Sequence, residues 1–317
     1  MNNRFTEHII KISLTAALFL TAAALPCVQA GAEAGITVTD MSGRTVSIGS
    51  PAGNVISLSP AGCEIMNSIG AAGLLCGRSE ACDYPDEILD VPVIDTGGEA
   101  YLSLLKASAP DLILAGSGDM TAEQADELTQ EGIPVVFCEA QDVEGTFDAV
   151  RMVGKLTGKE DIAGYVVEGM LSTLEILESS AEHLEGEPQS VLFLVASPEE
   201  TGTLMTAGSG TLLNTLSKLV GLENVFGDME GFCEITAEEA AQRNPDHIVS
   251  VAPDNRSTPL TEERILAEPG WADVKAVKEG SVRTFTGFEM CRPGPRLPEG
   301  AVMLYQFAYG AEDDPSL

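Results

Sequence analysis

Two separate stretches of the chain share one pattern of apolar and polar residues. Each has a helix-like segment, then a Pro-Asp pair, then an unbroken apolar run; Ala109-Pro110-Asp111 opens the first run and Asn244-Pro245-Asp246 the second. The residue before a proline is disfavoured in the helical region, so the preceding helix ends there, and the run suits a strand buried on both faces. The repeated pattern predicts two parallel-sheet lobes of the α/β class with a crevice between them, where ligands favour the carboxyl ends of strands.

The remaining periodicity predicts alternating strands and helices around these two stretches. Alternation around a glycine turn indicates a hairpin over residues 36–48, ahead of the first lobe. Ser59 is placed to cap a helix that begins at the following proline. The expected strands are 55–58, 111–115, 135–138, 191–195 and 247–251, and the expected helices are 61–69, 101–107, 121–131, 211–220 and 236–242.

A long helical segment separates the two lobes. Residues 143–156 have helical spacing, Thr157-Gly158 interrupts it, and residues 159–184 continue without an internal proline. A helix of that length reaches roughly 40 Å, enough to cross from one lobe to the other. We therefore expect a first lobe at 31–157, a spine helix at 158–187 and a second lobe at 188–317.

The amino terminus has the pattern of a secretory signal peptide at residues 1–30. Arg4 and Lys11 precede an uncharged run over 12–25, and Val28-Gln29-Ala30 supplies the small residues of a cleavage site. A membrane anchor is the alternative, but it needs about 18 or more apolar residues. Cys27 leaves open a lipid anchor, which would make a periplasmic protein a surface-held one. No later segment is expected to span a bilayer.

The charge balance limits the partners. The chain has 49 acidic and 17 basic residues, a net charge of −32. Such a surface repels nucleic acid and anionic membranes, and its simplest role is solubility. Six cysteines follow the predicted leader, without the spacing of a dense disulfide framework or a paired CxxC zinc site, so their pairing is left open.

Five motifs follow one another along nearly the whole mature chain. They are Ser57-Leu58-Ser59-Pro60, Cys82-Asp83-Tyr84-Pro85, the two Pro-Asp strands, Gly270-Trp271 with Lys275-Ala276-Val277-Lys278, and Arg292-Pro293-Gly294-Pro295-Arg296-Leu297. In this order they resemble the helical-spine substrate-binding proteins of ABC importers for vitamin B12, iron-siderophores and haem. The resemblance implies two Rossmann-like lobes with central, mostly parallel sheets, one joining helix, a ligand cleft between the lobes, a membrane permease as partner and no catalysis.

Within that family, Cys82-Asp83-Tyr84-Pro85 resembles the cobalamin branch. The resemblance places Phe232 where the branch has a tryptophan against the corrin, and Met205 where it has a phenylalanine, while two other aromatic positions fall on Ala81 and Thr96. We expect a corrinoid ligand without a protein-bound cofactor; an iron-siderophore or haem is the alternative, and a secreted enzyme on the same fold a second one. The expected ligand-binding residues are Ser59, Tyr84, Met205, Ser209, Phe232 and Arg292.

The resemblance also implies two glutamates that dock to permease arginines. Glu238 matches the second-lobe position, and its alternative role is a solvated charge in the first turn of a helix. The first lobe has Ser103 at the corresponding position, so Glu99 is the substitute candidate.

Other candidate chemistry has simpler alternatives. Cys82, Cys233 and Cys291 on cleft loops could form a soft-metal site, but half-buried thiols or one disulfide are the preferred interpretation. Arg292 and Arg296 could each bind an anionic group, and Arg296 could instead tie its turn to its own lobe. Backbone donors of residues 207–210 could hold an anion, or form a plain glycine turn. His183 and His247 do not suggest a catalytic set.

Overall fold

The computed structural model describes residues 35–98, 100–196, 204–255 and 257–310, within one compact unit that begins at Gly35. The predicted signal peptide and Cys27 lie outside the described residues, as does Glu99. None of the helices in these ranges is both long and apolar enough to cross a membrane.

A hairpin precedes the first lobe, as the alternation predicted. Strands β1 (Ile36–Thr39) and β2 (Thr45–Ile48) pair antiparallel. The turn is held by Asp40, whose Oδ1 accepts hydrogen bonds from the backbone N–H groups of Ser42 (3.0 Å) and Arg44 (2.8 Å). Gly43 supplies the positive φ of 83° that the turn requires.

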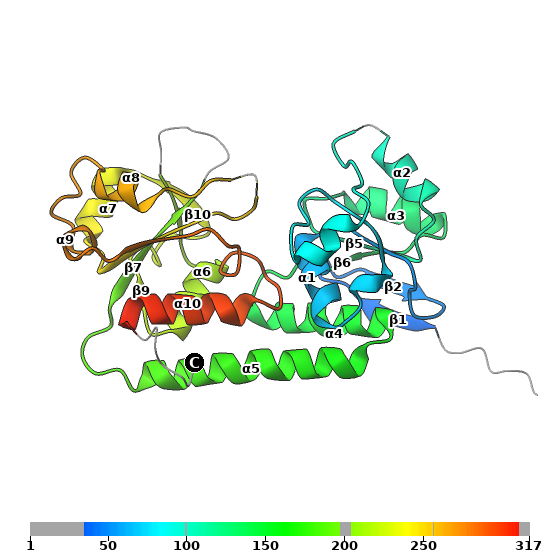
Figure 1. The fold of residues 1–317 in the computed structure, drawn as a ribbon, viewed down its shortest axis with the longest axis horizontal. Coiled ribbons are helices and arrows are strands. Elements are labelled where there is room, and N and C mark those ends of the chain that lie inside the picture. The colour runs from blue at the N-terminus through cyan, green and yellow to red at the C-terminus, as the bar shows by residue number, and fades with distance from the viewer. Residues whose placement is uncertain (1–34, 99, 197–203, 256, 311–317) are drawn as a thin grey trace, which may run out of the picture. The chain divides into compact units, whose positions relative to one another are not determined.

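The first lobe is a parallel sheet in the order β4-β3-β5-β6 with helices around it (Figure 1). Strands β3 and β5 are buried throughout because their residues are almost all apolar and lie between helical layers. The strands are β3 (Val55–Ser57), β4 (Leu75–Arg78), β5 (Leu112–Ala115) and β6 (Val135–Phe137), and the helices are α1 (Pro60–Ser68), η1 (Ala72–Leu74), η2 (Asp86–Asp90), α2 (Tyr101–Ala107), α3 (Ala122–Gln130) and α4 (Val143–Thr157).

The second lobe is a mixed sheet in the order β10-β8-β7-β11-β12, with β9 beside β7. Its centre is parallel, whereas β8 and β10 form an antiparallel edge. The strands are β7 (Ser190–Val195), β8 (Leu204–Ala207), β9 (Glu223–Asn224), β10 (Phe232–Ile235), β11 (His247–Val251) and β12 (Val282–Phe285), and the helices are α6 (Leu212–Leu219), α7 (Ala237–Arg243), α8 (Glu262–Leu266), α9 (Lys275–Glu279) and α10 (Leu297–Tyr309).

The two Pro-Asp motifs adopt the same structure in both lobes. Ala109 and Asn244, the residues before the prolines, have φ angles of 44° and 46°. Asp111 then accepts hydrogen bonds from the backbone N–H groups of Gly53 and Asn54, just before β3. Asp246 accepts equivalent bonds from the backbone and hydroxyl of Ser190, which begins β7. The motif therefore ends a helix and also fixes the start of the neighbouring strand.

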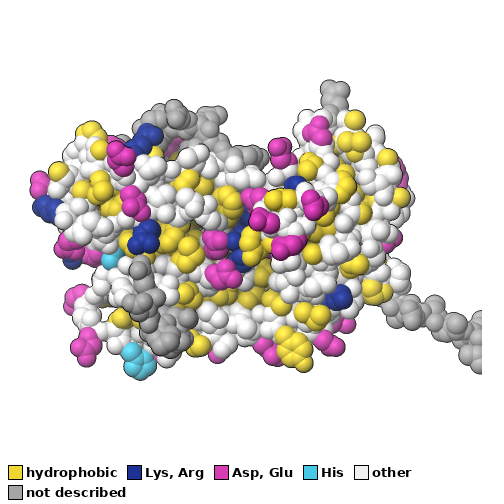
Figure 2. Space-filling view, viewed as in Figure 1, with side chains coloured by type: hydrophobic (Ala, Val, Ile, Leu, Met, Phe, Trp, Pro, Cys, Tyr) yellow, Lys and Arg dark blue, Asp and Glu magenta, His cyan; other side chains and the backbone are white. Residues whose placement is uncertain are grey.

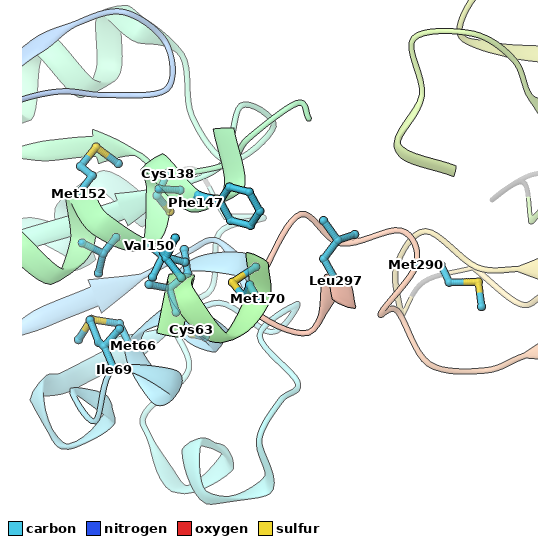
Figure 3. Packing of buried hydrophobic residues seen from close by; sticks show 14 of the residues in the cluster. Cys63, Met66, Ile69, Cys138, Phe147, Val150, Met152, Met170, Met290 and Leu297 are labelled. Carbon is cyan, nitrogen blue, oxygen red and sulfur yellow. The ribbon is translucent and has the colours of Figure 1, made fainter. Parts of the chain in front are cut away.

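Helix α5 (Glu160–Glu182) joins the lobes, and the predicted α/β fold is confirmed. Helix α5 follows α4 after Gly158, which has a left-handed φ of 67°. It packs against α4 toward one end and against α6 and α10 of the second lobe toward the other end (Figure 1). One apolar cluster includes residues of both lobes and of α5. Figure 3 shows part of it, with Leu297 at the start of α10 between Met170 of α5 and Met290.

The single tryptophan belongs to the core of the second lobe. Trp271 is 1% exposed, and its indole Nε1–H donates a 2.7 Å hydrogen bond to the carbonyl of Ala237, the first residue of α7. It packs within the second-lobe apolar cluster.

Candidate ligand-binding site

Two apolar side chains, one of them exposed, lie on one face of the antiparallel edge of the second lobe. Phe232 of β10 is 57% exposed, and Met205 of the adjacent β8 is partly buried. The register pairs Glu234 with Met205 and Phe232 with Ala207. Since directly paired residues share a face and alternate residues return to it, Met205 and Phe232 are diagonal neighbours on that face. The structure thus brings together two residues predicted to bind the ligand.

Tyr84 is the exposed aromatic candidate of the first lobe. Its side chain is 39% exposed, on the loop between β4 and η2. Buried Arg78 holds this loop by donating hydrogen bonds to the carbonyls of Cys82 (3.0 Å) and Ile88 (3.1 Å). The guanidinium carbon of Arg296 lies 3.7 Å from the centre of the Tyr84 ring, a cation–π contact that fixes one face of the ring.

The two serines predicted to contact ligand have local hydrogen-bonding roles. Ser59 caps α1 by accepting a bond from the Gly62 N–H at 3.3 Å, and it is 1% exposed. The Ser209 hydroxyl donates to the carbonyl of Met229 at 2.7 Å. Their ligand contacts remain predictions.

The backbone of residues 207–210 forms the plain glycine turn. The Gly208 N–H donates to the Gly231 carbonyl at 2.7 Å and the Ser209 N–H to the Met229 carbonyl at 2.6 Å. Because these amides are occupied, they cannot form the anion-binding loop considered from the sequence. A Cβ at Gly208 would collide with the Met229 carbonyl, which explains the need for glycine.

Five charged side chains meet beneath Tyr84, and we call them the Glu64 cluster. Arg292 Nη1 donates to Glu64 Oε1 at 2.7 Å and to Asp83 Oδ1 at 2.9 Å. Arg296 binds Glu64 through Nη2 (2.6 Å to Oε1) and Nε (3.2 Å to Oε2), and it also binds Glu289. The two arginines were predicted from the sequence as candidate site residues, whereas these carboxylates were not. The signal that could have identified Glu64 is its position as an acidic residue within the apolar run of the 61–69 helix.

These contacts change the interpretation of the arginines. Burial alone would lower the pKa of Arg292, but Asp83 and Glu64 raise it, so the guanidinium stays charged. Its predicted ligand contact stays a prediction, now for a group already paired with two carboxylates. Arg296 binds Glu289 on its own segment, as the alternative role expected, and it also binds Glu64, which belongs to α1 of the first lobe.

The thiol metal site considered from the sequence is not formed. In the described ranges, no group of three His, Cys, Asp or Glu side chains is arranged to hold a metal ion. Cys82 instead lies near Cys63 in the first lobe, and their contact lowers the pKa of Cys82 and raises that of Cys63. Cys233 contacts the Glu230 carbonyl at 3.2 Å, and burial raises the pKa of Cys291 to about 12. The six cysteines after the predicted leader are free thiols.

Both described histidines are engaged in hydrogen bonds. His183 Nδ1 lies 2.6 Å from the carbonyl of Ser179 at the end of α5. His247 is 5% exposed, with its ring nitrogens 2.6 Å from Ser281 Oγ and 2.6 Å from Gln189 Oε1. These contacts agree with the structural roles expected for both residues.

Glu238, the predicted second-lobe docking residue, is exposed in the first turn of α7. Its side chain accepts a 3.2 Å bond from Gln242, while Thr236 and Glu239 form the capping box. The helix start is therefore capped without Glu238. Counting back from Ala109 and Asn244 places Ser103 of α2 at the equivalent position of the first lobe, and it too is exposed.

The sequence profile of a family described as periplasmic binding protein matches residues 55–287, which is more than half of the chain. The chain belongs to this family. The match extends over both sheets and the joining helix of the binding protein and confirms the membership that its motifs predicted.

Three relatives indicate the breadth of the family. An uncharacterized ABC transporter substrate-binding lipoprotein of Bacillus subtilis is 27% identical over 279 residues, covering 86% of this chain and 85% of that protein. A vitamin B12-binding protein of Salmonella typhimurium is 28% identical over 196 residues, or 62% and 71% of the two chains. A Staphylococcus epidermidis structure, described as a possible iron-binding periplasmic solute-binding protein, has a TM-score of 0.69 and 26% identity, and the match covers 82% of this chain and all of that one.

Proposed function

We propose that this binding protein captures a corrinoid between its lobes and delivers it to an ABC permease in the membrane. The observation that carries this proposal is the exposure of Phe232 beside Met205 on the second lobe and of Tyr84 on the first. A large ring system binds chiefly by burying apolar area, at about 25 cal/mol per Å². These side chains provide such area and do not form a catalytic group.

The described charges favour a corrinoid over haem or an anionic iron chelate. Arg292 and Arg296 are paired with carboxylates, and both described histidines are engaged elsewhere. Haem propionates and an anionic chelate would both use unpaired cations, and an axial haem ligand would have to come from a residue other than these histidines, such as Tyr84 or Met205. The vitamin B12-binding relative supports the same choice, whereas the S. epidermidis structure supports an iron chelate, which remains the second candidate.

The proposal includes export and docking. The amino-terminal pattern is that of a cleaved leader. The lipoprotein relative supports the alternative in which cleavage occurs before Cys27 and this cysteine carries the lipid that holds the protein at the membrane. Glu238 would then pair with a permease arginine, since its position on α7 is exposed and is not needed for capping.

Isothermal titration calorimetry of the mature chain tests the ligand. We expect cobalamin or cobinamide to bind with at least micromolar affinity, equivalent to about 8 kcal/mol, and haem and ferric siderophores to bind far more weakly. Phe232→Ala should weaken corrinoid binding about tenfold through lost ring contact. Tyr165→Ala is the matched control, because Tyr165 is a 71% exposed aromatic residue on α5. Tight binding of haem or a siderophore instead would reject the corrinoid.

A further inference from the structure

The Glu64 cluster joins parts of the chain that are distant in sequence. Glu64 lies on α1 and Asp83 on the loop that carries Tyr84, both in the first lobe. Glu289, Arg292 and Arg296 lie on the segment between β12 and α10, which leaves the second-lobe sheet. The ion pairs therefore link the two lobes at a point other than α5.

The central members of this cluster are strongly desolvated. The side chains of Glu64 and Arg292 are 2% and 6% exposed, and that of Arg296 is 12% exposed. Buried charges are tolerated only when they are paired and hydrogen-bonded, and removing one partner leaves the others uncompensated. Glu64 is the shared partner of both guanidinium groups, so its loss would leave Arg292 with Asp83 alone and Arg296 with Glu289 alone.

The backbone around the cluster is fitted to these carboxylates. A Cβ at Gly294 would lie 3.0 Å from Glu64 Oε2, and a Cβ at Gly287 would collide with the Glu289 carboxylate. Leu297, the residue after Arg296, is fully buried and begins α10. Arg296 directly precedes α10 and contacts both Glu64 and the ring of Tyr84, so Glu64 is connected to the start of α10 and to Tyr84 through this one side chain.

We propose that Glu64 is a positioning residue for the ligand site: by binding Arg292 and Arg296 together it sets the place of the Tyr84 loop relative to the second lobe. The identity of the ligand in this proposal rests on the proposed function. Its structural part, the ordering of the Tyr84 loop and of the segment before α10, exists in the free protein.

Hydrogen exchange of the free, full-length mature chain tests the structural part. In Glu64→Gln, exchange of peptides covering 79–90 and 286–300 should accelerate at least about tenfold, because a buried pair has been broken. The exchange rates of peptides covering β7 and β11 should be unchanged. Asp148→Asn is the control, since it removes a carboxylate from the exposed pair with Arg151 on α4. Equal acceleration in every peptide, or no acceleration, would show that Glu64 has no positioning role.

Calorimetry with cobalamin and cobinamide tests the consequence for binding. The dissociation constant should rise at least about tenfold in E64Q and stay unchanged in D148N. The loss of binding free energy in the double variant E64Q/R292Q should be smaller than the sum of the losses in the two single variants, because both partners of one ion pair are then removed together. If hydrogen exchange accelerates in peptides 79–90 and 286–300 but the corrinoid affinity of E64Q is unchanged, the positioning role is rejected. Failure of the unaltered protein to bind either corrinoid would reject the proposed function, while the exchange result would still decide the role of Glu64.

Discussion

At the scale of single residues, Ala109 and Asn244 occupy the same unusual backbone conformation with different side chains. A left-handed φ costs an alanine roughly 1 kcal/mol or more, whereas asparagine tolerates it. Asn244 also accepts a 2.9 Å hydrogen bond from the Lys275 N–H, which Ala109 has no side-chain atom to imitate. The first lobe therefore contains a strained residue that the second lobe lacks.

Replacing Ala109 by Asn should raise the free energy of unfolding by about 0.5–1 kcal/mol, because the strain is relieved at an exposed position. Urea denaturation followed by circular dichroism measures this change. Asn244→Ala is the reciprocal variant and should be destabilised. An unstable A109N protein would mean that the left-handed backbone is not the source of strain.

His247 makes stability depend on pH. Burial lowers the pKa of its imidazole below the usual value of 6.5, so the unfolded state binds the proton more readily than the folded state. Stability should therefore fall as the pH falls below about 6.5, and this contribution should be constant above it. Denaturation midpoints at pH 7.5 and 5.0 measure the effect, and His247→Gln should show a smaller difference between them. An equal difference in both proteins would assign the dependence to other groups.

The Glu64 cluster shows why part of the site was not predictable. Ser59 capping and the exposed Phe232 follow from local sequence or from resemblance, but Glu64 and Arg292 are 228 positions apart. No local pattern specifies which carboxylate an arginine will meet. Only the fold brings the apolar helix that carries Glu64 against the turn before α10.

At the scale of elements, the predictions were most accurate where periodicity was long or a breaker was present. Helix α2 and strand β11 have the predicted bounds, and Gly158 divides α4 from α5 as expected. Strands β8 and β10 were not predicted. Each has four residues and includes polar side chains, and their pairing depends on the neighbouring strand and not on their own sequence.

The contact between α4 and α5 requires glycine at position 154. A Cβ there would collide with the Cβ of Ala163, so Gly154→Ala should lower the free energy of unfolding by about 1–3 kcal/mol through overpacking. Thermal and urea denaturation measure the loss. Gly169→Ala on α5 is the control: it has open space, and alanine is the better helix former, so stability should be unchanged or higher. Equal effects of the two changes would contradict the proposed close packing.

At the scale of the whole molecule, ligand capture and permease docking should be separable. Glu238→Arg should reduce uptake of labelled cobalamin to background in cells with the cognate permease, because it reverses the charge at the proposed docking surface. Affinity measured by calorimetry should not change. Glu178→Arg, an exposed position on α5, is the matched control. Reduced affinity in E238R, or equal loss of uptake in both variants, would reject the docking role.

The environment of Trp271 determines what intrinsic fluorescence of this protein can report. The indole is enclosed in the second lobe and bonded to the residue that precedes Glu238, while Phe232 and Tyr84 lie on other elements. Its emission should therefore respond to complex formation with the transporter more than to the arrival of cargo. Trp271 is the single tryptophan of the chain and lies beside the proposed docking helix, so binding of detergent-solubilised permease should change its emission without an attached dye.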